Sequence, residues 1–111
     1  MKLIVAIVQD EDSGRLVSEL MDHGFRVTKL ATTGGFLRAG NTTLISGVED
    51  DKLPEALGMI EKICKSREQI TASTAPMGST AAGGVYVPYP IRVTVGGATI
   101  FVLEVSQFLK V

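Results

Sequence analysis

The residues best suited to chemistry lie in and around the glycine-rich segment 32–40, which interrupts a strand-like pattern. Glycines allow backbone amides to approach an anion closely, because no Cβ atom stands in the way. The segment lacks the Gly-Lys-Ser/Thr ending of a P-loop, and it leads into a strand, whereas P-loop and Rossmann motifs lead into a helix that receives the phosphate. The sequence therefore excludes both of those phosphate-binding motifs.

The side chains that flank the glycines suit a nucleotide. Arg26 can pair with a phosphate, Phe36 can stack on a base, and Asn41 offers one donor and one acceptor to an adenine edge. Thr28 shares a strand face with Arg26, because strand side chains alternate, and Arg38 adds a second positive charge. A solvated hairpin loop, or an oligomer contact made through Phe36, is the competing interpretation.

A glycine on the following strand fits the same interpretation. Asn41 and Gly47 lie six residues apart on a strand expected over 41–48, so they share one face. Gly47 would leave room beside whatever Asn41 contacts, although close packing of neighbouring strands explains a glycine there equally well.

Catalytic and metal-binding options are narrow, because the chain has one cysteine, Cys64, and one histidine, His23. Cys64 falls on the apolar stripe of the second expected helix, and His23 ends the first, so both are interpreted as structural. The acidic group 10–12 could hold a divalent cation, but an N-cap at Asp12 or Ser13 explains it better. We therefore assign no catalytic residue, no metal and no cofactor.

Composition restricts the class of protein further. A chain of 111 residues, 45% hydrophobic and 21% charged, fits one globular domain over 1–111. A net charge of -1 gives no positive excess for a nucleic-acid polymer or an anionic membrane, and the apolar run 3–8 is too short to span one. The single cysteine cannot form an internal disulfide, so we expect a reducing, cytoplasmic location.

The elements that must position these residues follow from hydrophobic periodicity. Apolar runs or alternation predict strands over 3–9, 25–31, 41–48 and 69–72. Apolar residues three and four apart predict helices from Asp12 or Ser13 to before Gly24, and over 53–64 with Pro54 in the first turn.

The remainder of the chain completes an α+β fold. A long loop over 73–90 is followed by an expected β-hairpin, in which Gly96-Gly97 joins strands over 91–95 and 98–105. The order predicts a ferredoxin-like (βαββαβ) domain with a long loop and an extra C-terminal β-hairpin.

The run 25–43, FRVTKLATTGGFLRAGNTT, resembles the signature of the PII-like cyclic-di-AMP receptor proteins. The segments 7–10, Pro76-Met77-Gly78, Pro88-Tyr89-Pro90 and 95–99 continue the resemblance in the same order over nearly the whole chain. It implies a PII-like homotrimer with three equivalent ligand sites between subunits. The second messenger cyclic-di-AMP would be bound there and not consumed, and loop rearrangement would relay the signal to an unidentified protein target.

The resemblance also implies a set of ligand-binding residues. By motif match they are Arg26, Thr28, Gly35, Phe36, Leu37, Asn41, Gly47 and, from the last strand, Phe101. Two departures bear on affinity and selectivity: Ser79 follows Gly78 where the family commonly has a second glycine, and Lys110 replaces a glutamine that can contact ligand.

Three alternatives remain open at this point. One is a PII-like sensor of another adenine nucleotide, ATP or ADP. Another is a small ferredoxin-like enzyme in which Arg26 and Arg38 bind a phosphorylated substrate and Asp10 acts as a base. The third is a structural trimer-forming module whose exposed Phe36-Leu37 pair contacts protein.

Overall fold

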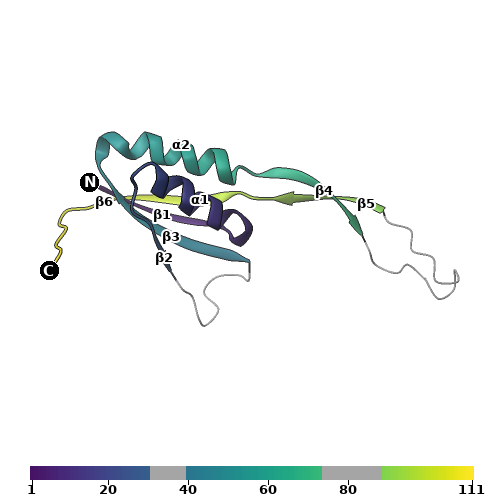
Figure 1. The fold of residues 1–111 in the computed structure, drawn as a ribbon, viewed down its shortest axis with the longest axis horizontal. Coiled ribbons are helices and arrows are strands. Elements are labelled where there is room, and N and C mark those ends of the chain that lie inside the picture. The colour runs from purple at the N-terminus through teal and green to yellow at the C-terminus, as the bar shows by residue number, and fades with distance from the viewer. Residues whose placement is uncertain (31–39, 74–88) are drawn as a thin grey trace, which may run out of the picture. The chain divides into compact units, whose positions relative to one another are not determined.

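The computed structural model describes residues 1–30, 40–73 and 89–111, which form two compact units. The larger unit contains residues 1–65 and 96–111, and the smaller unit lies within 66–95. The larger unit comprises β1 (Lys2–Gln9), α1 (Asp10–Asp22), β2 (Thr28–Leu30), β3 (Asn41–Val48), a short 3₁₀ helix η1 (Asp50–Lys52), α2 (Leu53–Cys64) and β6 (Ala98–Glu104) (Figure 1). The smaller unit is an antiparallel ribbon of β4 (Arg67–Ser73) and β5 (Tyr89–Val95).

The larger unit is a four-stranded antiparallel sheet covered on one face by both helices (Figure 1). Its strand order is β2-β3-β1-β6. In β1 the even-numbered residues from Ile4 to Val8 are buried and the odd-numbered ones are only partly buried, as the period of two requires. The even positions therefore face the helices.

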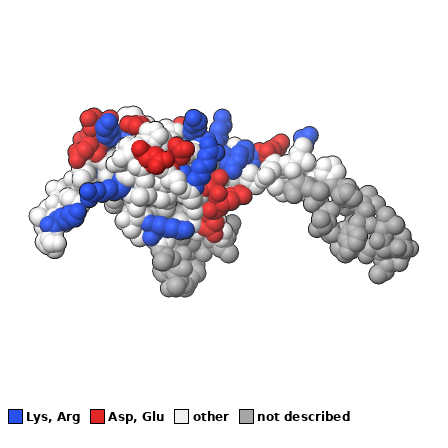
Figure 2. Space-filling view, in the orientation of Figure 1, with Lys and Arg blue, Asp and Glu red and all other residues white. Residues whose placement is uncertain are grey.

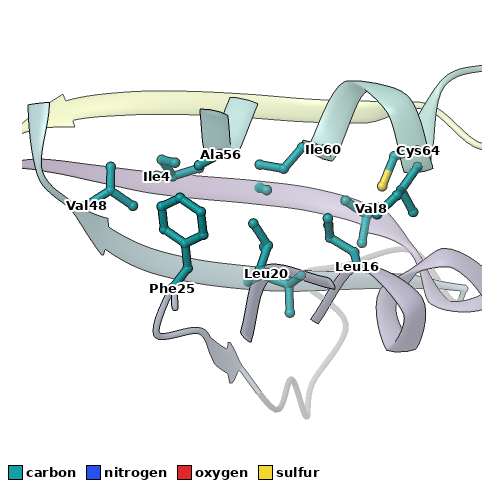
Figure 3. Close-up of a cluster of buried hydrophobic side chains, with 12 residues drawn as sticks. Ile4, Val8, Leu16, Leu20, Phe25, Val48, Ala56, Ile60 and Cys64 are labelled. Carbon is teal, nitrogen blue, oxygen red and sulfur yellow. The ribbon is translucent and has the colours of Figure 1, made fainter. Parts of the chain in front are cut away.

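The core fills the space between the sheet and the helices (Figure 3). Leu16 and Leu20 of α1 and Ile60 of α2 point onto the buried face of β1, and each is at most 3% exposed. Cys64 lies in the same cluster, which confirms its interpretation as a core residue. The remaining apolar gap near Leu16 and Ile60 is about 10 Å³, too small for a ligand.

Local signals located most elements correctly. The structure confirms β3 over 41–48 and α2 over 53–64, with Pro54 in the first turn. Gly24 follows α1 with φ +87°, the left-handed conformation that ends helices at glycine. The expected strand over 25–31 is shorter, because only Thr28–Leu30 pairs with β3.

The predicted helix cap is wrong. Helix α1 begins at Asp10, so the acidic residues 10–12 form its first turn, where negative charge complements the helix dipole. Gln9 occupies the N-cap position without a side-chain cap hydrogen bond. Ser13 instead donates from Oγ to the Asp10 carbonyl at 2.8 Å.

The predicted C-terminal hairpin is also wrong. Strand β5 pairs with β4, and β6 pairs with β1, so Gly96-Gly97 connects two sheets. The reason is that β1 is a central strand whose second edge needs a partner, and residues 98–104 supply it. The mixed α+β class with an antiparallel sheet and two helices is confirmed, whereas the expected long loop lies largely at 74–88, outside the described residues.

Candidate functional site

The sheet has a second face, opposite the one that α1 and α2 cover (Figure 1). We call it the open face. It is formed by the side chains that point away from α1 and α2: Leu3, Val5, Ile7, Gln9, Thr28, Leu30, Asn41, Thr43, Ile45, Gly47, Thr99, Phe101 and Leu103. Phe101 and Leu103 are 54% and 48% exposed there, so much of this face is apolar and accessible.

Three predicted ligand-binding side chains, Thr28, Asn41 and Phe101, and Gly47 share the open face, but the single chain does not gather them. Thr28 lies opposite Ile45, Ile45 opposite Val5, and Val5 opposite Phe101. Because neighbouring strands are about 4.8 Å apart, Thr28 and Phe101 are separated by roughly 14 Å across the sheet.

A similar separation runs along β3. Asn41 begins this strand and Gly47 lies near its end. Six steps of about 3.3 Å place their backbones roughly 20 Å apart. The two residues therefore belong to two different hollows in the surface of this chain.

The first hollow, which we call the Asn41 pocket, has a volume of about 360 Å³. Its lining residues are Ile7, Gln9, Asn41, Gly96, Gly97, Ala98 and Thr99. Gln9 lies directly opposite Asn41 in the β1–β3 register, so two carboxamides stand side by side. Such groups can read the donor and acceptor edge of a base.

Two glycines shape one wall of the Asn41 pocket. Gly96 and Gly97 have φ of +82° and +95°, which favours residues without Cβ. The Gly96 N–H donates to Gln9 Oε1 at 2.8 Å, and the Gly97 N–H donates to the Cys64 carbonyl. Because a backbone amide only donates, the Gly96 bond fixes which end of the Gln9 carboxamide accepts, leaving Nε2 as its donor end.

The second hollow, which we call the Arg26 pocket, has a volume of about 230 Å³. It is lined by His23, Gly24, Phe25, Arg26, Gly47, Val48, Glu49 and Lys52. Ser46 Oγ donates to the Arg26 carbonyl at 2.6 Å and so ties the backbone at Arg26 to β3. Arg26 and Lys52 make this pocket suitable for a phosphate group, with Glu49 as the opposing charge.

Sequence reasoning missed Gln9 and Lys52. Gln9 is the polar last residue of an otherwise apolar strand. It lies two residues after Ile7 and so shares a strand face with it, which was the sequence signal that could have placed Gln9 on the open face. Lys52 belongs to η1, and its place beside Arg26 depends on the turn between β3 and α2. The predicted residues Gly35, Phe36 and Leu37, and also Arg38, lie outside the described residues.

Both signs of charge are present on the face of the described residues that Figure 2 shows. Acidic and basic side chains are interspersed over the face shown in Figure 2. Within residues 1–30, 40–73 and 89–111, no group of three or more His, Cys, Asp or Glu side chains is placed to hold a metal ion. None of the helices in that part of the chain is long and apolar enough to cross a membrane.

An antiparallel sheet with two covering helices, carrying two polar pockets at opposite ends of one strand, defines a small α+β binding protein. A model of the cyclic-di-AMP receptor family matches residues 1–111. The chain belongs to this family, which is a receptor family and not an enzyme family.

A solved structure supports the fold. The chain is similar to a functionally unknown protein from Pediococcus pentosaceus whose crystal structure has been determined. The two are 44% identical, with a TM-score of 0.76, and the match covers 99% of this chain and 96% of the other.

Proposed function

We propose that this protein is a signal-transduction protein that binds cyclic-di-AMP between neighbouring copies of itself and passes the signal to a protein target. Family membership supports the ligand. The observation that supports the location is the separation of Asn41 from Arg26 and Gly47, which line different pockets. One subunit offers a base-reading end and a phosphate-binding end, and neither is complete alone.

The chemistry of the ligand matches these two ends. Cyclic-di-AMP carries two adenines and two phosphates. Gln9 and Asn41 at one end offer carboxamides to an adenine edge, and Arg26 and Lys52 at the other offer positive charge to phosphate. A second copy that brings its Arg26 pocket against the first copy's Asn41 pocket would present both chemistries to one ligand molecule.

The open face supplies the reason for copies to associate. Val5, Phe101 and Leu103 lie close together on it. Removing the exposed apolar surface of Phe101 and Leu103 from water is favourable, so a second copy that covers this surface is stabilised in place. We propose that copies cover one another in a closed cyclic homotrimer, so that each interface is equivalent and each carries one ligand.

We also propose that the larger unit is a ferredoxin-like, PII-like subunit. Its sheet order β2-β3-β1-β6 and its two helices on one face support this. In this interpretation β6 is the fourth strand of the sheet, and the β4–β5 ribbon is an insertion between α2 and β6.

Isothermal titration of the purified protein with cyclic-di-AMP tests the proposal, with cyclic-di-GMP, AMP and ATP titrated in parallel. We expect saturable binding of about one ligand per subunit that is specific to cyclic-di-AMP. Asn41→Ala should weaken it, whereas Gln69→Ala, which removes an exposed carboxamide from β4, should not. Absence of binding, or equal binding of ATP, would contradict the proposal.

A further inference from the structure

Asp10 is the point where α1, β1 and the start of β3 are tied together. Its backbone N–H donates to the Gly40 carbonyl at 2.8 Å. Its carboxylate Oδ1 accepts a hydrogen bond from Thr42 Oγ1. The residues before and after Asn41 are therefore both held by Asp10.

Asn41 itself projects to the other side of the sheet. Thr42 is buried, 6% exposed, among the side chains that face the helices, whereas Asn41 lies on the open face opposite Gln9. Because successive strand residues point to opposite faces, fixing the Thr42 side chain on one face fixes the direction of Asn41 on the other. Gly40, with φ +98°, turns the chain into the strand immediately before this point.

This arrangement explains why an acidic residue stands directly after β1. The Asp10 carboxylate accepts the hydrogen bond from Thr42. Because Asp10 is exposed, water can solvate this carboxylate if the Thr42 hydroxyl is removed. Loss of the hydrogen bond should consequently disturb the direction of Asn41 more than the stability of the fold. Recognition of a base requires its contacts to be held to within about half an ångström.

We propose that Asp10 and Thr42 are positioning residues that set Asn41 for ligand binding from the helix side of the sheet. The inference rests on the proposed function, because it assigns to these two residues the accuracy of the Asn41 contact with cyclic-di-AMP. They act through Asn41 and do not themselves contact the ligand.

Two pairs of variants test this positioning role. Thr42→Val removes the hydroxyl at nearly constant shape, and Thr42→Ser keeps it. Asp10→Ala removes the accepting carboxylate, and Asp10→Asn keeps an Oδ1 acceptor at the same place. Ile60→Val, a change in the core away from the pocket, controls for a small general loss of stability.

The first readout needs no ligand. Asn41 is the only asparagine in the sequence, so asparagine-selective ¹⁵N labelling gives one side-chain amide signal that reports its setting. We expect Thr42→Val and Asp10→Ala to move this signal, while Thr42→Ser and Ile60→Val leave it close to that of the unaltered protein; Asp10→Asn adds a second asparagine and is therefore compared by affinity alone. An unmoved signal in both disruptive variants would overturn the proposal.

The second readout is the affinity for cyclic-di-AMP by calorimetry. We expect the two disruptive variants to bind about threefold to tenfold more weakly and the two conservative variants to restore binding. If the unaltered protein binds and the disruptive variants bind equally well, the positioning role is refuted. If the unaltered protein does not bind, the proposed function fails, and the Asn41 signal alone decides whether Asp10 and Thr42 set this side chain.

Discussion

Replacing Phe101 with alanine should weaken self-association more than it weakens the fold. Phe101 is 54% exposed in the single chain, on the open face opposite Val5. A phenylalanine buries roughly 200 Å² when fully covered, so about 110 Å² is left for a second copy to cover. At about 25 cal/mol per Å², this area contributes about 3 kcal/mol to each interface, or roughly a hundredfold in the association constant.

Sedimentation velocity over a wide range of protein concentration, without ligand, measures this effect. We expect the unaltered protein to sediment as an oligomer and Phe101→Ala to dissociate at much higher concentrations. Val102→Ala is the matched control, because Val102 is 43% exposed on the same strand but lies opposite the buried Ile4, on the helix side. If Phe101→Ala and Val102→Ala assembled alike, the open face would not be the interface.

Three further predictions concern the Arg26 pocket and the region near it. Arg26→Ala should weaken cyclic-di-AMP binding by about 1.5–3 kcal/mol through loss of a charge-assisted contact, while Arg92→Ala on β5 leaves calorimetric affinity unchanged. Gly47→Ala should retain the thermal midpoint, because its Cβ would meet only Met1 Sδ at 3.9 Å, yet bind ligand about tenfold more weakly by filling the pocket. The hydrogen bond from the Met1 ammonium lowers the pKa of Asp50, so its stabilisation is present above the ordinary pKa and is lost as pH falls through the lowered value. An NMR titration should show the lowered pKa, and N-terminal acetylation should raise it again.

The elements that sequence predicted well are those whose signals are local. The bounds of β3 follow from a run rich in Thr, Leu, Ile and Val, and those of α2 from apolar residues three and four apart, with Pro54 marking its start. The partner of a strand is not local information. Residues 98–104 could pair with the strand before them or with β1, and only the unfilled edge of β1 decides in favour of the second.

The candidate site divides in the same way. Parity along β3 placed Asn41 and Gly47 correctly on one face, whereas alternation grouped Thr28 with Arg26, which lies outside β2. Parity put Gln9 on the face of Ile7, but its place in the Asn41 pocket also depends on a hydrogen bond from the N–H of Gly96, a residue 87 positions away. The distance between the two pockets could not be predicted either, because a sequence motif gives the identity of the residues but not their separation in the sheet.

Strand β3 also bears on how such a receptor could evolve. Thr42, Leu44, Ser46 and Val48 are buried toward the helices, while Asn41, Ile45 and Gly47 lie on the open face and are less buried. Apart from Thr43, which is buried on the open face, the core residues and the residues that line the two pockets thus alternate along this strand. Under the proposed function, exchanges at 41 and 47 would alter ligand recognition while the buried positions between them keep the core intact, so new specificity would not have to await a new fold.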